Sequence, residues 1–407
     1  MSEWKETDII PKVPLKWNEF KLNEIGDFKN GVNFSAESFG EGYPVINVKQ
    51  LYQTRFASID GLDEIIPESV KRIDEYELKN GDLLFVRSSV TLQGTGQIVM
   101  VNKLPLKRTV FSGFIIRFRI TSNKVIRMYL NYLLRTKFYK EHFINIAAGT
   151  SIINISQDTL KNISIFLPPL PEQKVIASVL SSLDDKIDIL HRQNKTLETM
   201  AETLFRQWFI EEADDEWEVR PLGELVTVKR GGSPRPIQEY ISETGLRWLK
   251  ISDATKTSSP FIFEIKEHIK EEGLKKTTLL KKGTLVLSNS ATPGIPKILQ
   301  VDSCIHDGWL HFPKSHFSNE FLYLLFINIR QELINQGNGS IFTNLKTDIL
   351  KEFPIPIPSD KSLQDFDDKV KQIFQKLLRN SIQIRTLEKL RDTLLPKLMS
   401  GEVRVKC

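Results

Sequence analysis

Residues 171–208 read PEQKVIASVLSSLDDKIDILHRQNKTLETMAETLFRQW, and this stretch decides the fold. Apolar side chains return along it at alternating intervals of four and three residues, which is the seam of a coiled coil. The seam consists of Ile176, Leu180, Leu183, Ile187, Leu190, Asn194, Leu197, Ala201, Leu204 and Trp208. A helix of this length, rising about 1.5 Å per residue, forms a rod roughly 57 Å long.

A second seam of the same kind lies near the C-terminus, 190 residues further along the chain. It consists of Phe366, Val370, Ile373, Leu377, Asn380, Ile384, Leu387, Arg391, Leu394 and Leu398. Asn380 and Arg391 interrupt its apolar character, and Pro396 is a point at which the helix can kink. Two amphipathic helices that pack only on their own domains would also show such stripes, but those stripes usually run for fewer turns.

The asparagines of the two seams predict how the rods pair. In an antiparallel pair aligned at the helix centres, near residues 192 and 382, partner numbers sum to about 574, as Asn194 and Asn380 do. A lone Asn in an apolar seam lowers stability, whereas two that face each other form a hydrogen bond and fix the register. We therefore expect an antiparallel coiled coil with Asn194 opposite Asn380.

The remainder of the chain is also duplicated. Residues Trp17, Leu22, Glu24 and Gly31 recur 200 positions later as Trp217, Leu222, Glu224 and Gly231. Residues Gly149, Asn154, Asp158, Leu160 and Lys161 recur 190 positions later as Gly339, Asn344, Asp348, Leu350 and Lys351. A unit of this length is too long for a solenoid repeat, whose period is roughly 20–50 residues. It predicts one globular module and one helical module used twice, in a pseudo-two-fold molecule suited to a two-part target.

These patterns predict an α+β protein in four segments. Residues 1–167 and 213–358 are two globular domains of mixed α/β structure in pseudo-two-fold tandem, and residues 168–212 and 359–407 are the two long helical spacer regions. The first domain is expected to hold strands at Tyr43–Val48, Leu83–Val86, Gln97–Val101, Phe114–Ile120 and Ile163–Leu167, and a helix at Val125–Glu141. The second is expected to hold strands at Trp248–Ile251, Leu285–Leu287 and Lys297–Val301, and a helix at Glu320–Asn335.

Composition is that of an ordinary globular protein. The chain has 407 residues, a net charge of +5 and a pI of about 8.9, a mildly basic balance that is compatible with nucleic acid without being diagnostic of it. Two cysteines, Cys304 and Cys407, give no disulfide framework and indicate a reducing compartment. No signal peptide and no apolar run of about 20 residues is present, so we expect a cytoplasmic protein without a membrane partner.

Several motifs together resemble the specificity subunits of type I restriction-modification systems. They are the junction Leu167–Gln173 (LPPLPEQ), Leu183–Ile187 (LDDKI) within the following helix, Gly149–Ile155 (GTSIINI), Trp217–Glu224 (WEVRPLGE) and the tail Leu394–Val403 (LLPKLMSGEV). The resemblance covers essentially the whole chain, in the same order of segments. The second junction departs from the pattern, because Ser359, Asp360 and Lys361 follow Pro358 where the first junction has Pro-Glu-Gln.

This resemblance implies a function and a set of partners. In that family each target-recognition domain, here residues 1–167 and 213–358, reads one half of a bipartite, asymmetric site on double-stranded DNA. The paired helices fix the unread spacer and dock two methyltransferase (modification) subunits, which carry S-adenosylmethionine. ATP-dependent translocase-nuclease (restriction) subunits, with ATP and Mg, join for restriction. The chain itself is expected to bind no cofactor and no metal and to catalyse nothing.

The sequence holds a few patterns that mimic catalytic or metal sites. It has neither a Gly-x-x-x-x-Gly-Lys-Ser/Thr phosphate loop nor the Asn/Asp-Pro-Pro-aromatic loop expected of an adenine methyltransferase. Asp253 followed by Glu264 and Lys266 mimics a metal-dependent nuclease, but such short matches are common by chance. Metal ligation could also be read from Cys304, His306, His311 and His316. Their spacing fits no standard zinc pattern, so incidental residues of a strand and loop are the better interpretation.

Candidate DNA contacts lie in corresponding loops of the two copies. The first loop follows the opening strand, where glycine allows close backbone approach to phosphate and cations lie beside it. Its residues are Lys29, Asn30 and Asn33 in the first copy and Lys229, Arg230, Ser233 and Arg235 in the second. The second loop offers side chains of the kinds that reach base edges. Its residues are Arg87, Ser88, Ser89, Gln93, Thr95 and Gln97 in the first copy and Asn289, Ser290 and Thr292 in the second.

Two other functions remain open from sequence alone. A structural adaptor would use the paired helices to assemble partners and its globular domains to bind protein rather than DNA. A nuclease built on Asp253 is the third hypothesis. For any single loop residue named above, the alternative is a solvated polar side chain with no role in binding. Divergent polar loops on a conserved scaffold favour DNA readout, because two half-sites of different sequence would require them.

Overall fold

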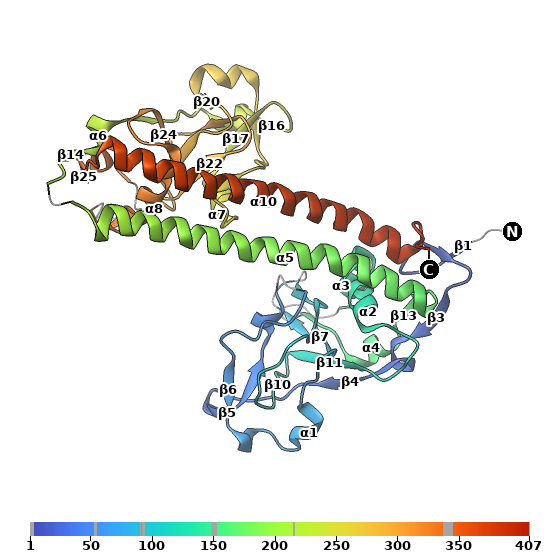
Figure 1. Cartoon of the computed structure of the whole chain (residues 1–407). Helices are drawn as coiled ribbons and strands as arrows, with labels where there is room; N and C mark the ends of the chain where they lie inside the picture. Colours follow the sequence, from blue (N-terminus) through green and yellow to red (C-terminus); the bar gives the residue numbers. More distant parts are fainter. Residues whose placement is uncertain are drawn as a thin grey trace. The chain divides into compact units, whose positions relative to one another are not determined.

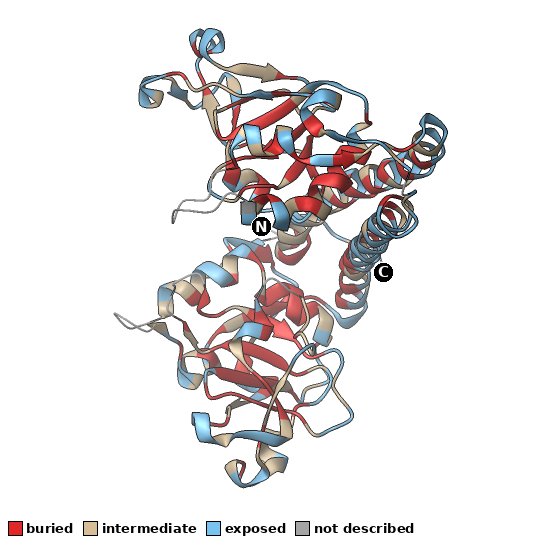
Figure 2. Cartoon of the chain, turned by 90° about the vertical axis from the view of Figure 1, so that its left-hand side faces the viewer, coloured by how far each residue is buried: buried red, intermediate tan, exposed pale blue. Residues whose placement is uncertain are grey.

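The computed structural model describes residues 4–52, 55–89, 91, 94–147, 153–214, 216–336 and 345–406. The chain forms two compact units: unit 1 comprises Met1–Ile187 with Thr386–Cys407, and unit 2 comprises Asp188–Arg385. Each unit therefore contains one globular domain together with a part of each long helix. Buried residues concentrate in the strands of the globular domains and along one side of the long helices (Figure 2).

The core sheet of unit 1 has the strand order β4-β11-β7-β9, with antiparallel neighbours (Figure 1). Its strands are β4 (Gly26–Asn30), β11 (Ile115–Ile120), β7 (Leu83–Val86) and β9 (Ile98–Met100). All of β7 is buried, and alternate side chains enter different cores because successive residues of a strand face opposite ways. Leu83 and Phe85 join the core that contains Tyr129 and Phe143, whereas Leu84 packs into a second core on the other face.

Smaller elements complete unit 1. A three-stranded sheet has the order β10 (Val110–Phe111), β5 (Phe39–Ile46) and β6 (Asp63–Ile65), and Phe111 and Ile46 pack into the second core. The other strands form pairs, β1 (Trp4–Glu6) with β2 (Lys12–Pro14), β8 (Ser88–Ser89) with β12 (Ile153–Asn154), and β3 (Asn18–Lys21) with β13 (Ser164–Leu167). The short helices are α1 (Ile73–Tyr76), α2 (Arg127–Leu134), α3 (Lys137–Ile146) and α4 (Gln157–Lys161).

The globular domain of unit 2 repeats this plan. Its core sheet has the order β15-β24-β21-β22-β18, with β15 (Val226–Arg230), β24 (Trp309–Ser315), β21 (Leu285–Ser288), β22 (Pro296–Leu299) and β18 (Phe261–Ile262). A second sheet holds β16 (Ile241–Ser242), β19 (His268–Ile269), β17 (Leu246–Leu249), β23 (Ser303–Ile305) and β20 (Thr278–Leu280), and β14 (Val219–Pro221) pairs with β25 (Pro354–Pro356). The helices are α6 (Leu222–Leu225), α7 (Ile251–Thr255), α8 (Asn319–Gln336) and α9 (Thr347–Glu352).

Backbone hydrogen bonds confirm the duplication. The amide of Gly31 donates to Ile115 O at 3.1 Å, and that of Gly231 donates to Trp309 O at 2.9 Å. A Cβ atom at Gly31 would lie 2.1 Å from Ser112 O, and one at Gly231 would lie 2.3 Å from His306 O. Any other residue would push the two chain segments apart, so both copies keep glycine at this crossing.

The helix predicted over Val125–Glu141 is wrong as a single element. The structure breaks it into α2 and α3 at Thr136, whose backbone is extended with φ −61° and ψ 156°. The Thr136 hydroxyl donates to Leu133 O at 2.7 Å, and this bond satisfies a carbonyl at the end of α2. The counterpart helix α8 is continuous, as predicted.

The long helices are α5 (Leu170–Arg206), which continues into a π-helical turn at Gln207–Glu211, and α10 (Asp360–Ser400). In unit 1 Ile176, near the start of α5, shares a core with Leu398 near the end of α10. In unit 2 the order is reversed: Phe205, near the end of α5, lies 6.0 Å from the ring of Phe366 near the start of α10. The two helices therefore pair antiparallel, as predicted (Figure 1). Helix α10 continues through Pro396.

The seam asparagines meet within unit 2. Asn380 Nδ2 donates to Asn194 Oδ1 at 2.9 Å, and Asn194 Nδ2 donates to the hydroxyl of Ser381 at 3.3 Å. Asn380 is 1% exposed, so its amide depends on these partners. Among the described residues, no helix is long and apolar enough to cross a membrane.

Candidate nucleic-acid interface

The predicted loops fall at equivalent places in the two domains, where the core sheet meets the second sheet. Arg87 N donates to Phe114 O at 2.8 Å, and Asn289 N donates to Gly308 O at 2.9 Å. These paired bonds make Arg87 equivalent to Asn289. By the same alignment Gly113 is equivalent to Asp307, the residue just before Gly308.

The first loop of unit 1 is held mainly within the domain. Lys29 and Asn30 lie in β4 rather than in a turn, and the Lys29 ammonium forms an ion pair with Glu75. This partner holds the pKa of Glu75 below its usual range, chiefly through the hydrogen bond from Lys29. The Asn30 Oδ1 atom is buried and has no partner among the described residues. Asn33 is exposed.

The second loop of unit 1 combines one accessible cation with several buried groups. Arg87 is half-buried, and its guanidinium donates to Gly113 O at 3.3 Å. Ser88, in β8, donates to the side chain of Asn154 in β12. Side chains of Ser89 and Thr95 are 6% and 0% exposed, so burial removes them from the surface that could meet a ligand. Gln97 Nε2 donates to Leu51 O at 2.8 Å, which fixes this side chain inside the domain. Gln93 lies outside the described residues.

In unit 2, three of the predicted residues contact Asp307. Ser233 Oγ donates to Asp307 Oδ1 at 2.7 Å, and Arg235 Nη2 lies 3.4 Å from Asp307 Oδ2. Arg230 Nε donates to the backbone oxygen of Asp307. The hydrogen bond from Ser233 is the largest cause that lowers the pKa of Asp307. The Arg235 side chain remains 80% exposed, so its guanidinium is held on one side and free to bind on the others. Lys229, in β15, is also exposed.

The second loop of unit 2 is only partly accessible. Asn289 is 1% exposed, and its Oδ1 atom has no partner among the described residues. Ser290 lies beside the turn at Gly308, where its Oγ atom would be 2.4 Å from an added Cβ. Thr292 is half-buried, and its backbone oxygen accepts a hydrogen bond from Ser288 Oγ. Ser290 therefore lies next to the turn that Asp307 and Gly308 form.

Sequence reasoning missed Asp307 and Glu75, the two carboxylates that orient predicted cations. Asp307 carried one usable signal, because Asp307-Gly308 is a typical turn pair between two strands. Glu75 carried none, since it reaches Lys29 across 46 residues of sequence. In the second domain the predicted residues are thus joined through the segment that follows β23, and in the first domain Lys29 is joined to α1.

The residues that mimicked a nuclease have structural partners. The Asp253 carboxylate accepts a hydrogen bond from Lys250 N at 3.1 Å at the start of α7. Gln50 does the same for Asn47 N at 3.0 Å in unit 1, so this position caps a helix in both copies. Glu264 forms an ion pair with Arg385.

The residues that mimicked metal ligands lie along two strands and their ends. Cys304 is buried in β23, and burial raises the pKa of its thiol to about 11. His306 Nδ1 accepts a hydrogen bond from Gly308 N at 2.8 Å. Burial lowers the pKa of both His306 and His311. The ring of His316 lies against that of Phe317, at 5.2 Å between centroids.

The junctions explain the Pro-Glu-Gln motif in physical terms. Buried Gln173 donates to Pro168 O at 2.9 Å and accepts from Ile126 N at 2.9 Å, which joins the start of α5 to the globular domain. Glu172 forms a bidentate ion pair with Arg404 from the tail. At the second junction Asp367 accepts from Ser318 Oγ at 2.6 Å, so a different residue pair ties α10 to the domain of unit 2.

Comparison with known proteins gives this arrangement a family. Residues 14–199 and 214–391 each match the family described as "Type I restriction modification DNA specificity domain". The MjaIX specificity subunit of Methanocaldococcus jannaschii is 30% identical over 433 residues, covering 100% of this chain and 97% of that protein. The HindI specificity subunit of Haemophilus influenzae is 23% identical, covering 95% of this chain and 99% of that one.

A solved structure has the same fold. The crystal structure of the type I restriction-modification S subunit from M. genitalium superimposes with a TM-score of 0.63 at 17% identity, covering 97% of each chain. The chain thus has two globular domains of mixed α/β structure joined by two long antiparallel helices. This architecture defines a class of proteins in which the same domain and helix occur twice in one chain. The chain belongs to the type I restriction-modification specificity subunit family.

Proposed function

We propose that this chain is the non-catalytic DNA-reading subunit of a type I restriction-modification complex. The domain of unit 1 reads one half of a bipartite site on double-stranded DNA, and the domain of unit 2 reads the other half. The paired helices hold the distance between the half-sites. Phosphate contacts would position each domain, and side chains at base edges would supply sequence preference.

One observation supports this function over a purely structural adaptor. Equivalent backbone positions carry different hydrogen-bonding groups, namely Arg87 against Asn289 and Gly113 against Asp307, while the bonds that hold the loops are the same. The half-buried Arg87 could pair with guanine at a base edge, whereas Asn289 is 1% exposed and offers no accessible side chain at the equivalent position. A scaffold that keeps its framework and varies these groups is suited to two half-sites of different sequence.

The partners and cofactors follow from the same proposal. Two methyltransferase subunits would dock on the paired helices and bring S-adenosylmethionine, and translocase-nuclease subunits would bring ATP and Mg. Support for a non-catalytic role comes from the partners of the nuclease-like residues, since Asp253 caps α7 and Glu264 pairs with Arg385. The chain would therefore supply recognition, and its partners would supply the chemistry.

The test is to purify the chain with and without its methyltransferase partner and to map methylated adenines by single-molecule sequencing. We expect methylation at one bipartite sequence with the assembled complex and none with the chain alone. Methyl transfer by the chain alone would contradict the non-catalytic role. An assembled, active complex whose methylation followed no defined sequence would favour the adaptor instead.

A further inference from the structure

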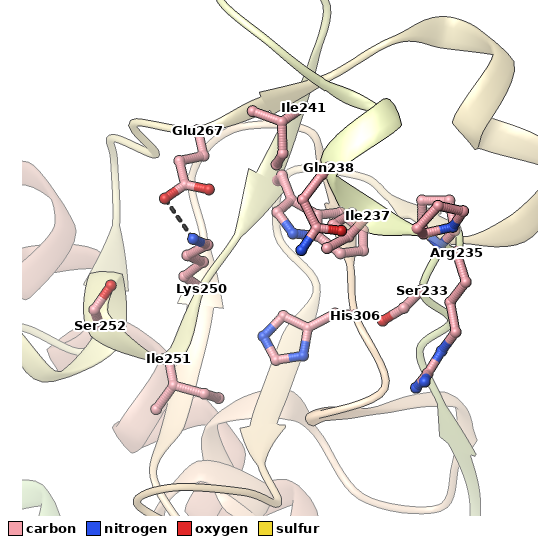
Figure 3. A pocket seen from close by; sticks show the side chains of 13 residues that line it. Ser233, Arg235, Ile237, Gln238, Ile241, Lys250, Ile251, Ser252, Glu267 and His306 are labelled. Atoms are coloured by element: carbon pink, nitrogen blue, oxygen red, sulfur yellow. Dashed lines mark ion pairs between the residues drawn. The ribbon is translucent and has the colours of Figure 1, made fainter.

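A cavity of about 1110 Å³ opens beside the Asp307 cluster, wholly within unit 2 (Figure 3). Its lining combines apolar and aromatic side chains with charged and amide groups. Apolar and aromatic side chains come from Ile237, Ile241, Trp248, Ile251 and His306. Polar side chains come from Ser233, Arg235, Gln238, Lys250 and Glu267. Ligand pockets typically join an apolar lining to a few such polar groups, at volumes of about 300–1,000 Å³.

The equivalent place in unit 1 is bridged by side chains. There, Ser112 Oγ donates to Asn47 Oδ1 at 2.9 Å. Asn47 corresponds to Lys250, because both are bonded through their amide to the residue three positions later. Ser112 corresponds to His306, since each directly precedes the equivalent Gly113 or Asp307.

In unit 2 the two corresponding side chains turn apart. Lys250 Nζ pairs with Glu267 Oε1 at 2.5 Å, while the His306 ring is held by the Gly308 amide. Figure 3 shows the Lys250–Glu267 pair on one side of the cavity and His306 facing into it. The side chains at these two positions thus meet each other in unit 1 and are held by other partners in unit 2.

The lining suits a flat heteroaromatic ring that carries a phosphate. The His306 and Trp248 rings lie 5.8 Å apart between centroids, and aromatic faces stack on nucleic-acid bases. Gln238 is exposed, and an amide both donates and accepts, as the edge of a base does. At the mouth the exposed Arg235 guanidinium offers a fork of donors that matches phosphate.

We propose that this cavity binds one nucleotide, with the base against His306 and the phosphate on Arg235. The inference rests on the proposed function, because the cavity adjoins the loops assigned to DNA. Two sources supply this ligand: a base of the bound DNA that has left the helical stack, or a free nucleotide. DNA is the expected source, since the walls are formed by the same segments that carry Ser233 and Asp307.

Mismatched DNA tests whether the nucleotide comes from the bound DNA, because the two kinds of base contact change the binding affinity in opposite directions. The assembled complex is bound to its mapped site, and single mismatches are placed at each position in turn. A mismatch at a base read in the groove weakens binding, because a contact is lost. A mismatch at a base that enters the cavity strengthens binding by roughly tenfold or more, because unpairing no longer opposes it. The methylated adenines are treated separately, because a methyltransferase partner also draws its target base out of the helical stack. We expect one further strengthening position, in the half-site read by the second domain.

A matched pair of variants assigns that effect to the cavity. Ile241 lines the cavity and is 40% exposed, and Leu274 is 40% exposed in the same domain without lining it. Ile241→Trp should fill the cavity and abolish the tighter binding of the mismatched DNA. Leu274→Trp, outside the cavity, should leave that tighter binding unchanged. Thermal unfolding of both variants checks that each remains folded, and Gln238→Ala, at an exposed side chain, gives a second and milder change that should reduce the effect.

Deoxynucleoside monophosphates test the second source by calorimetry on the full chain. Saturable binding that Ile241→Trp abolishes, without any strengthening mismatch, assigns the cavity to free nucleotides. If neither arm responds while the complex still binds its site, the nucleotide inference is overturned and the proposed function stands. If the complex shows no sequence preference at all, the proposed function fails, and the inference fails with it.

Discussion

Asp307 shows how one residue separates two copies of the same scaffold. Its equivalent in the first domain is Gly113, which has no side chain to offer, and there the Arg87 guanidinium donates to the backbone oxygen instead. In the second domain the Asp307 carboxylate holds Ser233 and approaches Arg235. An arginine held by a carboxylate on one side presents fewer orientations to a ligand, so it discriminates better.

Replacing Asp307 should therefore disturb only the second half-site. We expect Asp307→Ala to weaken site-specific binding by about tenfold and to relax base preference in one half-site, because Arg235 loses its orientation. Methylation mapping of the assembled complex provides the measurement. Asp302→Ala is the matched control, since it removes another ion pair, with Lys281, from the same domain. Equal loss at both half-sites would show that Asp307 supports folding rather than readout.

Lys297 is the second informative residue, because it is buried at a position where the first domain has Val99. Its ammonium donates to Thr257 O at 2.8 Å and also to Ser259 O. Burial lowers the pKa of Lys297 to about 8 from 10.5. The folded state therefore holds this proton less tightly than the unfolded state. Below about pH 8 the amine is charged in both states, and burying its charge lowers the free energy of unfolding by the full amount.

The pH dependence of stability has a defined sign here. As pH rises from about 8 towards 10.5, the amine loses its proton in the folded state but keeps it in the unfolded state. The cost of the buried charge therefore disappears, and the free energy of unfolding rises relative to a variant without the amine. We expect the free energy of unfolding of the native chain to rise relative to Lys297→Val between pH 7.5 and 9.5 (about neutral to alkaline). Denaturant titrations at each pH measure this difference, and the lost hydrogen bonds shift it by a constant amount. Parallel profiles for the two proteins would exclude a lowered pKa.

At the scale of elements, the long helices are tied to the domains by polar contacts that differ between copies. In unit 1 the Tyr132 hydroxyl donates to Asp184 at 2.6 Å, and Arg391 donates to the same carboxylate at 2.9 Å. In unit 2 the residue 190 positions after Asp184 is Phe374, and its ring lies 5.3 Å from that of Tyr323 between centroids. Buried polar networks need every partner, whereas aromatic packing tolerates small changes.

The Asn194–Asn380 pair makes a prediction about the seam. Asn194→Leu should destabilise the chain more than the double variant Asn194→Leu with Asn380→Leu, because only the single change leaves a buried amide without its partner. A double-mutant cycle measured by denaturant unfolding should give a coupling energy of about 1 kcal/mol or more. Additive effects would mean that the two amides do not depend on each other.

Helix length makes a second prediction for the element scale. Four residues inserted after Ile187 in α5 and four after Arg385 in α10 fall at the boundary between the two units. Each insertion adds about 6 Å of helix, close to two base-pair steps of about 3.4 Å. We expect the mapped recognition sequence to keep its bases and to gain a longer unread spacer. The control has four alanines inserted in the 214–216 connection, and it should leave the spacer unchanged because neither long helix is lengthened. An unchanged spacer in the helix variant would show that helix length does not set the distance between the half-sites.

At the scale of the whole molecule, the duplication predicts independent readers. Residues 1–167 form one core by themselves and share another with Ile176 of α5 and Leu398 of α10. Exchanging them for the equivalent domain of a relative should change one half-site and preserve the other. Methylation mapping of the chimera gives the result directly. The contacts of Gln173 and Glu172 should be retained in its design, because they join this domain to α5 and to the tail. A simultaneous change in both half-sites would contradict independent reading.

The sequence by itself determined the architecture. A seam repeated at 3.5-residue average spacing (about the heptad value) predicts paired rods, since only long helices keep such a stripe on one side. The recurrence of Gly31 as Gly231 indicated the duplication, whereas the chain crossing that excludes a side chain at each was seen only in the structure. Paired Asn194 and Asn380 predicted the antiparallel order, and the two helices do run antiparallel. These features depend on local sequence patterns or on comparison of the two copies, so they can be predicted without a structure.

Only the tertiary structure decided which polar residues meet. Asp307 reaches Ser233 across 74 residues, and Glu75 reaches Lys29 across 46, so neither pairing leaves a periodic signal. The break at Thr136 likewise depends on a side-chain bond to Leu133 O that competes with helix continuation. Hydrophobic periodicity records which face of an element is buried, but the partner of a polar side chain is set by how distant segments pack.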